Sequence, residues 1–198
     1  MNTRRFRDFV QDFTAFVERS GGDEERVFRE GRALLADLIA HDDWLPEAFA
    51  RPDPDRYQQY LLHCDPLERF SVASFVWGPG QKTPVHDHTV WGMVGVMRGA
   101  ELCEEYGIDG GRLAPGGNHR VEPGAIDLVS PRVGDIHRVS NALANEASIS
   151  VHVYGANIGA VRRHVYDPVT GHPKPFISGY SSAVLPNIWD RSAQSARA

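Results

Sequence analysis

The sequence predicts a single, mainly β domain, a sandwich or barrel of antiparallel strands preceded by amino-terminal α-helices. From Tyr57 onward, short segments rich in Val, Ile, Tyr, Phe and Trp alternate with clusters of Gly, Pro, Asp and Asn, a rhythm typical of such folds. Before Tyr57, apolar residues recur at helical spacing. A chain of 198 residues with 41% hydrophobic content can bury one core and is too short for two.

The helical part divides into two segments. The first carries an apolar stripe and ends at Ser20-Gly21-Gly22; its stripe consists of Phe6, Phe9, Val10, Phe13, Phe16 and Val17. Asp23 is placed to cap a second helix, which ends near His41 and whose buried side consists of Val27, Leu34, Leu35, Leu38 and Ile39. A short helix and a turn-rich connection are expected over 44–57, where proline and acidic residues are dense.

The β part is expected to contain strands at 57–62, 70–77, 90–97, 125–129 and 147–154. The glycine-rich stretches 109–111 and 115–118 are predicted to be loops. Residues 173–190 mix prolines and glycine with large apolar side chains, and we expect them to form an ordered strap across the barrel.

Charge and cysteine content narrow the function class. A formal net charge of −5, with arginines dispersed among carboxylates, gives no sign of a nucleic-acid partner. No apolar run is long enough to cross a bilayer, and Arg7 and Asp8 stand where an export signal needs an apolar stretch, so we expect a cytoplasmic protein with no membrane partner. Cys64 and Cys103 are then expected to be free thiols. Small-molecule chemistry is the favoured class.

The segment Pro84-Val85-His86-Asp87-His88 predicts a metal site. In a β-strand, His86 and His88 would point to the same face. His137, just past a turn that contains Pro131 and Gly134, is the best source of a third ligand. Three neutral imidazoles leave a divalent metal its full charge, which favours anionic substrates, but they do not choose among iron, zinc, copper and nickel.

A second polar pattern lies in 148–154, where Ser148, Ser150, His152 and Tyr154 alternate with Ile149, Val151 and Val153. Periodicity alone fits two structures equally, a strand whose polar face looks into a barrel and an exposed edge strand with solvated polar groups. The metal motif favours the barrel.

The histidine segments resemble the paired motifs of the cupin superfamily. They read Gly80-x5-His86-x-His88-x10-Gly99 and, later, Gly134-x2-His137-x3-Asn141. The resemblance implies a mainly β fold, a cupin double-stranded β-helix (jelly-roll) barrel with amino-terminal α-helices. It implies one cupin domain over 1–198, with a helical preface (1–56), a barrel (57–165) and a carboxy-terminal strap (166–198). Many cupins have a glutamate ligand after the His-x-His pair, but 89–93 contains no carboxylate.

Together with the histidines, the Ser150-x-His152-x-Tyr154 run resembles the thiol dioxygenases, the cupin branch that includes cysteine dioxygenase and 3-mercaptopropionate dioxygenase. The likeness extends to 57–62, 155–159 and 185–190. It implies an Fe(2+) cofactor on His86, His88 and His137. It also implies a relay in which Ser150 fixes the tautomer of His152, His152 orients Tyr154, and the phenol donates toward oxygen or the substrate carboxylate.

Two departures from the animal cysteine dioxygenases bear on the substrate. No cysteine lies between His88 and Gly99, so the thioether to the tyrosine cannot form. The carboxylate-binding arginine is replaced by a glutamine, assigned to Gln59 with Gln58 as the alternative, which resembles a glutamine-type bacterial branch that tends to prefer 3-mercaptopropionate. Arg163 becomes the candidate for the substrate carboxylate; Arg162 is the alternative, because adjacent side chains in a strand face opposite ways.

The resemblance thus implies a non-haem Fe(II) thiol dioxygenase that converts a small thiol carboxylate, preferably 3-mercaptopropionate, and O2 into the sulfinate, with Tyr154 and Arg163 holding the carboxylate. Cysteine dioxygenase activity is the runner-up. Another metal-dependent cupin enzyme is a further alternative, which the Ser150-His152-Tyr154 run disfavours. A non-enzymatic metal or small-molecule sensor is a third, although neither the amino-terminal helices nor the net charge argues for the DNA-binding segment that usually accompanies one. The oligomeric state stays open.

Overall fold

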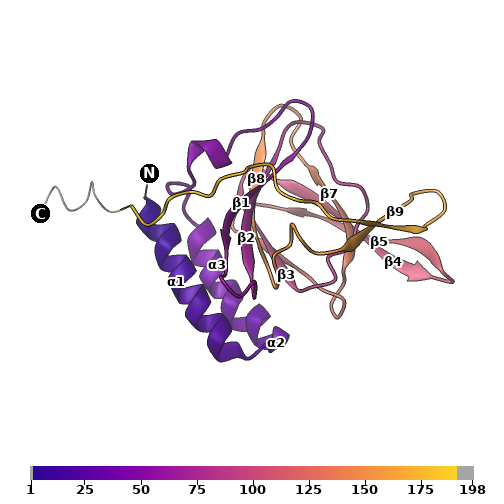
Figure 1. The fold of residues 1–198 in the computed structure, drawn as a ribbon. Helices are drawn as coiled ribbons and strands as arrows, with labels where there is room; N and C mark the ends of the chain where they lie inside the picture. Colours follow the sequence, from indigo (N-terminus) through magenta and orange to yellow (C-terminus); the bar gives the residue numbers. More distant parts are fainter. Residues whose placement is uncertain (1, 191–198) are drawn as a thin grey trace, which may run out of the picture.

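The computed structural model describes residues 2–190, and its amino-terminal part is helical as predicted (Figure 1). Helix α1 (Thr3–Ser20) ends where Gly21 adopts the left-handed conformation with φ 61°. Helix α2 (Glu24–Arg26), a π-helical turn (Val27–Gly31) and α3 (Arg32–Ile39) follow one another without a break. The Asp23 carboxylate accepts a hydrogen bond from the Arg26 amide and caps this second segment. A short 3₁₀ helix (Glu47–Phe49) leads into the β part.

The strands form three sheets. Their bounds are β1 (Gln58–Cys64), β2 (Ser71–Trp77), β3 (Gly92–Arg98), β4 (Glu101–Asp109), β5 (Arg112–Val121), β6 (Ile126–Val129), β7 (Ile136–Asn141), β8 (Ser148–Tyr154), β9 (Arg163–Tyr166) and β10 (Pro173–Phe176). A five-stranded sheet has the order β1-β2-β8-β3-β6, a three-stranded sheet the order β5-β4-β7, and β9 pairs with β10. All pairings between these strands are antiparallel. The fold is the double-stranded β-helix barrel with amino-terminal helices that the sequence predicted.

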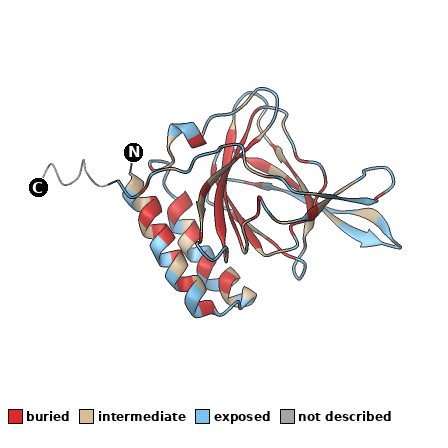
Figure 2. Cartoon of the chain, viewed as in Figure 1, coloured by how far each residue is buried: buried red, intermediate tan, exposed pale blue. Residues whose placement is uncertain are grey.

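The main hydrophobic core lies between the helices and the five-stranded sheet (Figure 2). Phe13 of α1 is fully buried, and its ring centroid lies 4.9 Å from that of Phe70, which precedes β2. Ile149, Val151 and Val153, the apolar face of β8, belong to the same cluster. The opposite face of this sheet is therefore free to line the barrel interior.

The five predicted strands correspond to β1, β2, β3, β6 and β8, whereas β4, β5, β7, β9 and β10 were not predicted. The prediction of a loop at 115–118 was wrong, because these residues lie within β5. β5 is the edge strand of its sheet, where a proline without an amide donor is tolerated, and a register shift between Glu104 and Tyr106 accommodates the glycines.

The carboxy-terminal segment follows β10 back across the barrel toward α1 (Figure 1). The Ser181 amide donates to the Gln59 carbonyl (2.8 Å), and the Arg7 guanidinium donates to the Ile188 carbonyl (3.1 Å). We keep the division into preface, barrel and strap as a proposal, although β9 crosses the boundary expected between 165 and 166. Residues 191–198 of the strap lie outside the described part.

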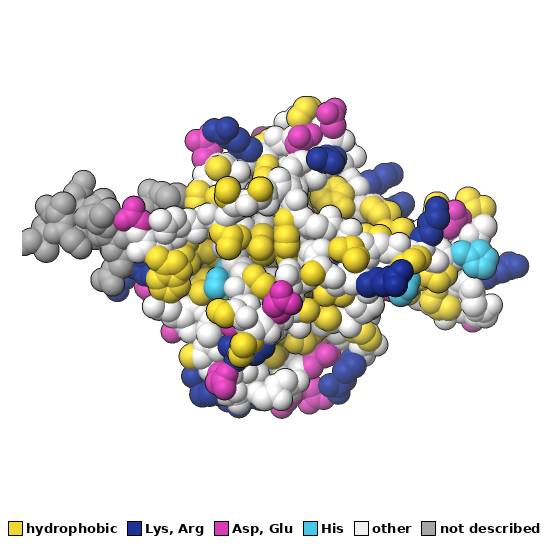
Figure 3. All heavy atoms as spheres, in the orientation of Figure 1, with side chains coloured by type: hydrophobic (Ala, Val, Ile, Leu, Met, Phe, Trp, Pro, Cys, Tyr) yellow, Lys and Arg dark blue, Asp and Glu magenta, His cyan; other side chains and the backbone are white. Residues whose placement is uncertain are grey.

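On the face shown in Figure 3, cationic and anionic side chains are interspersed over the surface rather than gathered by sign. Within residues 2–190, none of the helices combines the length and the apolar character needed to cross a membrane. The cytoplasmic location stays a prediction.

Truncating Phe13 tests the packing of α1. We expect Phe13→Ala to lower the free energy of unfolding by about 3–5 kcal/mol, because it removes a fully buried ring from the main core. Urea unfolding monitored by circular dichroism measures this. Gln11→Ala, at an exposed position of the same helix, is the control and should stay within about 0.5 kcal/mol of the parent. Equal, small effects of both changes would contradict the packing.

Candidate metal centre and substrate cavity

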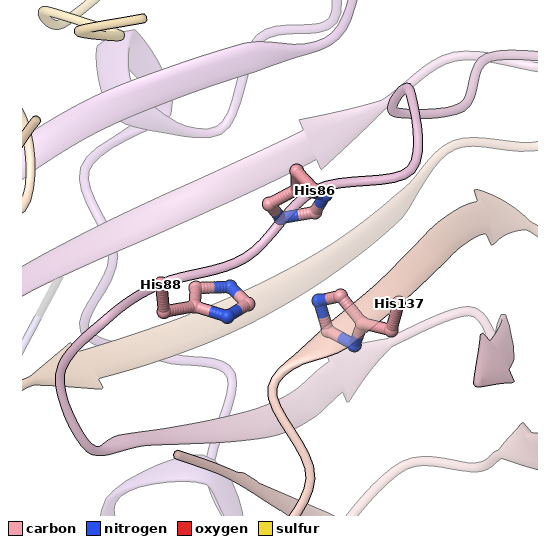
Figure 4. A group of neighbouring side chains, drawn as sticks. All are labelled: His86, His88 and His137. Atoms are coloured by element: carbon pink, nitrogen blue, oxygen red, sulfur yellow. The ribbon is translucent and has the colours of Figure 1, made fainter. Parts of the chain in front are cut away.

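Three buried histidines converge inside the barrel (Figure 4). The nearest ligand atoms of His86, His88 and His137 all lie within 4.8 Å of one another. His86 and His137 face each other directly, because the amide of each donates to the carbonyl of the other at 3.0 Å. The structure thus brings together the three predicted ligands; their role in binding metal stays a prediction.

The expectation that His86 and His88 lie in a β-strand was wrong. They occupy an extended segment before β3 in which His86 makes only isolated bridges, to His137 and to Val165 of β9. Between them, Asp87 points the other way and accepts hydrogen bonds from the His164 amide (2.7 Å) and the Tyr166 hydroxyl (2.9 Å). The two histidines still share a side because the backbone is extended, and Asp87 supplies the anchoring that a strand would have given.

Asp135 holds the His88 ring and its backbone in place. Its carboxylate accepts hydrogen bonds from the amides of His88 and Thr89, each at 2.9 Å, and lies 3.1 Å from His88 Nδ1. Burial opposes ionisation of Asp135, but these bonds outweigh it and lower its pKa. Thr89 adopts φ 61°, a strained conformation for a β-branched residue, so Asp135 holds the segment in a shape that it would not adopt by itself.

The ring nitrogens show that a metal fits this group. His86 Nδ1 lies 3.1 Å from the Pro84 carbonyl, and His88 Nδ1 faces Asp135; each can donate its proton there and leave Nε2 as a free lone pair. His88 Nε2 is buried without a hydrogen-bond partner, an arrangement that costs free energy unless a ligand completes it. Burial lowers the pKa of His86 and of His137 well below the usual range, so both are neutral, as metal ligation requires.

Beside the histidines, the polar side chains of β8 form a continuous hydrogen-bonded chain. His152 Nε2 lies 2.8 Å from Ser150 Oγ, and His152 Nδ1 lies 2.8 Å from the Tyr154 hydroxyl oxygen. All three residues are buried, and the Tyr154 ring stacks on that of His88 with centroids 5.4 Å apart. The polar face of β8 therefore looks into the barrel and not into solvent.

A cavity of about 30 Å³ adjoins the metal centre. Residues from several elements line it, among them Gln59, His86, His137, His152, Tyr154 and Arg163. A larger groove of about 410 Å³ lies next to it and shares five of its lining residues, Tyr57, Gln59, Pro84, Phe176 and Ser178. The dimensions suit a small ligand that enters past the strap.

Of the two pairs of alternatives, the structure places Gln59 and Arg163 at the cavity. Gln59 lines it, whereas the Gln58 amide donates to the nearby Arg56 carbonyl (3.1 Å). Arg162 is exposed, and Arg163 is 4% exposed. Their roles toward a substrate stay predictions.

Arg163 is a buried cation that lacks an ionic partner among the described residues. One guanidinium nitrogen donates to Ser178 Oγ (2.7 Å), and the Phe176 ring centroid lies 4.8 Å from the guanidinium carbon. Its Nε is buried without a partner. Burial lowers the pKa of Arg163, yet a guanidinium remains charged, so an anion in the cavity would relieve its desolvation.

Gly92 occupies the position opposite Tyr154 in the pairing of β3 with β8. A Cβ atom there would lie 2.6 Å from the Tyr154 ring and 2.8 Å from a methyl group of Val129. The glycine therefore lets the tyrosine lie flat against β3, and it gives a physical reason for the absence of a side chain that could crosslink to the ring.

The sequence analysis did not assign a role in the site to three residues that the structure places there. Asp135 stands two residues before His137, a spacing that could have suggested a role. Ser178 gave no signal in a segment without periodicity. Cys103, expected only to be a buried free thiol, has its Sγ 3.5 Å from His137 Nδ1.

Comparison with known proteins identifies a family for this chain. The family model described as Cysteine dioxygenase type I matches residues 3–167. A curated relative, Cysteine dioxygenase type 1 of Danio rerio, is 26% identical over 136 residues, which cover 66% of this chain and 64% of that protein. The chain thus spans somewhat less than two thirds of this relative.

Solved structures give weaker likenesses. A cupin-like protein from Thermotoga maritima aligns with TM-score 0.48 and 18% identity over 65% of this chain and 92% of its own. A cupin 2 conserved barrel domain protein from Rhodopseudomonas palustris aligns with TM-score 0.44 and 17% identity over 62% of this chain and 77% of its own.

Metal titration tests the histidine group. We expect one divalent ion per chain, loss of binding in His88→Ala, and an affinity lowered about 10- to 100-fold in Asp135→Asn, which loosens the ring it orients. Metal analysis after dialysis and isothermal titration measure both effects. His119→Ala is the control, because His119 belongs to a separate group with Cys103 and Asp127. Loss of the ion in His119→Ala but not in His88→Ala would place the metal in that other group.

Proposed function

Because this chain belongs to the cysteine dioxygenase type I family, we propose that it is a non-haem Fe(II) thiol dioxygenase acting on a small thiol carboxylate. The reaction adds both atoms of O2 to the thiolate sulfur and gives the sulfinate, so that R–S⁻ and O2 become R–SO2⁻. The preferred substrate is 3-mercaptopropionate. The proposed ligands are His86, His88 and His137.

One observation carries the proposal: a buried guanidinium, without an anionic partner within residues 2–190, lines the same cavity as two of the three histidines. Arg163 reaches the cavity from β9, with His86 and His137 on its wall. A ligand with a carboxylate at one end and a thiolate at the other satisfies the cation and the metal together. A short carbon chain between these groups matches the small volume.

The lining also favours 3-mercaptopropionate over cysteine. Among the described residues that line the cavity, none is Asp or Glu, so no carboxylate is present to pair with an α-ammonium group. Gln59 can hydrogen-bond a carboxylate but cannot neutralise it, which leaves that task to Arg163. Phe75 and Val139 offer apolar surface to the methylene groups.

In the proposed reaction, Arg163, Tyr154, Ser150 and His152 each have a separate role. A bound ferrous ion supplies the redox chemistry that joins O2 to sulfur. Arg163 and the Tyr154 hydroxyl hold the substrate carboxylate. This fixes where the thiolate sulfur lies, so that it meets O2 in a favourable orientation. Ser150 and His152 hold the Tyr154 hydroxyl in place through their hydrogen bonds.

Cysteine is the second candidate substrate, and one finding favours it: the curated relative carries the name Cysteine dioxygenase type 1. The two candidates differ by the ammonium group alone. A direct comparison of rates therefore separates them.

Oxygen uptake by the Fe(II)-reconstituted chain tests the function. We expect uptake with 3-mercaptopropionate, one sulfinate formed per O2 consumed as identified by mass spectrometry, and a lower kcat/KM with cysteine. A kcat/KM for cysteine higher by about tenfold would reverse the order of substrates. No uptake with either thiol at full iron occupancy would reject the dioxygenase.

Replacing Arg163 tests how the carboxylate is bound. We expect Arg163→Met to lower kcat/KM for 3-mercaptopropionate about 10- to 100-fold, the equivalent of a lost charge-assisted hydrogen bond. Steady-state oxygen uptake measures this, with propanethiol, which lacks the carboxylate, as a second substrate for which the loss should disappear. Arg162→Ala, at the adjacent exposed position, is the matched control and should match the parent. An equal loss with both thiols would contradict a carboxylate-binding role.

A further inference from the structure

Glu101, the first residue of β4, is a buried acid that the reaction proposed above does not use. It is 1% exposed, and its Oε1 has no hydrogen-bond partner. No Lys, Arg or His forms an ion pair with it anywhere in residues 2–190. A carboxyl group placed in this way is costly if ionised, so its position calls for a reason.

Glu101 lies at the Ser150 end of the hydrogen-bonded chain. The side chains of Ser150 and Trp77 lie close enough to lower the pKa of Glu101, and Asn141, which pairs with Glu101 across β4 and β7, donates to the Trp77 carbonyl at 3.0 Å. The Trp77 indole also donates to Ser150 Oγ at 3.4 Å. The hydrogen-bonded groups run from the Trp77 indole through Ser150 and His152 to the Tyr154 hydroxyl at the cavity, and the buried Glu101 carboxyl adjoins the Ser150 end.

We infer that Glu101 is a positioning residue whose protonation state sets the direction of this chain, and thereby decides whether the Tyr154 hydroxyl donates into the cavity. The inference rests on the proposed function only in that a substrate carboxylate accepts the hydrogen bond from the Tyr154 hydroxyl. The hydrogen bonds that join Ser150, His152 and Tyr154 do not depend on that function.

With Glu101 protonated, every group has one consistent arrangement. The carboxylic acid and the Trp77 indole both donate to Ser150 Oγ, which must then donate to His152 Nε2. The proton of His152 is therefore on Nδ1, which donates to the Tyr154 oxygen. The Tyr154 proton is left free and points into the cavity, where a carboxylate can accept it.

With Glu101 ionised, the direction reverses. The carboxylate can only accept, so Ser150 donates to it and receives a hydrogen bond from His152 Nε2. His152 Nδ1 then carries a lone pair, to which Tyr154 donates. The phenol now presents only lone pairs to the cavity, and these repel an anionic substrate.

The surroundings keep the other members of the chain from taking up or losing a proton. Burial lowers the pKa of His152 well below its usual range, so the ring is neutral and has a single proton to place. Burial raises the pKa of Tyr154, so the phenol stays protonated. Glu101 is the member that titrates, because burial raises its pKa to about 8 against the smaller, opposing effect of the nearby Ser150 and Trp77 side chains.

The titratable groups around Glu101 come from three strands. Asp127 of β6 raises the pKa of Glu101 further through charge repulsion. Cys103 lies on β4 itself, and His152 and Tyr154 lie on β8; burial holds the Cys103 thiol neutral by raising its pKa to about 12. The residues paired with Glu101 on β5 and β7 are Val121 and Asn141, which carry no charge.

The tautomer of His152 gives a direct readout in the full-length, metal-free chain. Nitrogen chemical shifts of ¹⁵N-histidine distinguish a proton on Nδ1 from one on Nε2, and comparison with His152→Ala assigns the signals. We expect the Nδ1–H form at pH 6 and a change to the Nε2–H form with a midpoint near pH 8. Neither iron nor a thiol is needed, so the result does not depend on the proposed reaction.

Glu101→Gln should hold His152 as Nδ1–H at every pH, because the amide can donate to Ser150 but cannot ionise. Ser150→Ala should also abolish the pH-dependent change, since it breaks the link between Glu101 and His152. Glu105→Gln, at an exposed position of the same strand, is the matched control and should keep the midpoint. A single tautomer in the parent chain from pH 6 to 10, or an unaltered midpoint in Glu101→Gln, would overturn the inference.

The iron-loaded enzyme adds a kinetic readout. The alkaline limb of kcat/KM for 3-mercaptopropionate should have its midpoint near pH 8 in the parent and should be lost in Glu101→Gln. A limb that persists unchanged in Glu101→Gln would show that another group controls it. Absence of any oxygen uptake would reject the proposed function, while the tautomer measurement would still decide the role of Glu101.

Discussion

The pairing of β8 on both edges is the constraint on which the rest of the structure depends. Hydrogen bonds to β2 and to β3 run along the whole strand, and His152 is held opposite Ala73 on one side and Val94 on the other. Its alternate side chains must therefore go to opposite faces, apolar ones under the helices and polar ones into the barrel. A slip of one residue would exchange the faces, burying Ser150 and His152 under the helices.

This constraint also explains where glycine is needed. Tyr154 lies flat in the barrel only because Gly92 faces it, and α3 approaches β3 closely because Gly95 leaves room for Ile39. An added Cβ at Gly95 would lie 2.8 Å from the Ile39 side chain. The two glycines act on opposite faces of the same strand, so the polar interior and the helical cover are adjusted independently.

Much of the fold could be predicted from the sequence, because the spacing of apolar residues indicates which face of a helix or strand packs against the core. The apolar stripe around Phe13 lies on the buried face of α1, and the alternation of β8 separates apolar residues under the helices from polar residues inside the barrel; both patterns were recognised in the sequence. β5 was missed because an exposed edge strand needs no apolar pattern and tolerates Pro115 and two glycines. The histidines of the site were found by type and spacing. Asp135 and Glu101 were not, because a carboxylate in a sequence carries no sign of whether it is buried.

The choice between Arg162 and Arg163 shows the same limit. Alternation says that only one of the two can point inward, but which one depends on the register of β9 against β10, and that pairing joins residues across a turn without apolar pattern. The answer came from tertiary structure, where Ser178 and Phe176 receive the Arg163 guanidinium. Alternation within the single strand β8 could therefore be recognised in the sequence, whereas the choice between two adjacent arginines depends on where a second segment lies.

The strap has a consequence for the order in which the protein folds. The strap is held by contacts between residues far apart in the sequence: the Gln59 amide donates to the Ser181 hydroxyl, 122 residues later, and the Arg7 guanidinium donates to the Ile188 carbonyl, 181 residues later. Such distant contacts are made late, because the entropy of closing long loops must be overcome first. Closing these long loops costs more entropy than pairing neighbouring strands, so we expect the strap to dock after the inner sheet has formed.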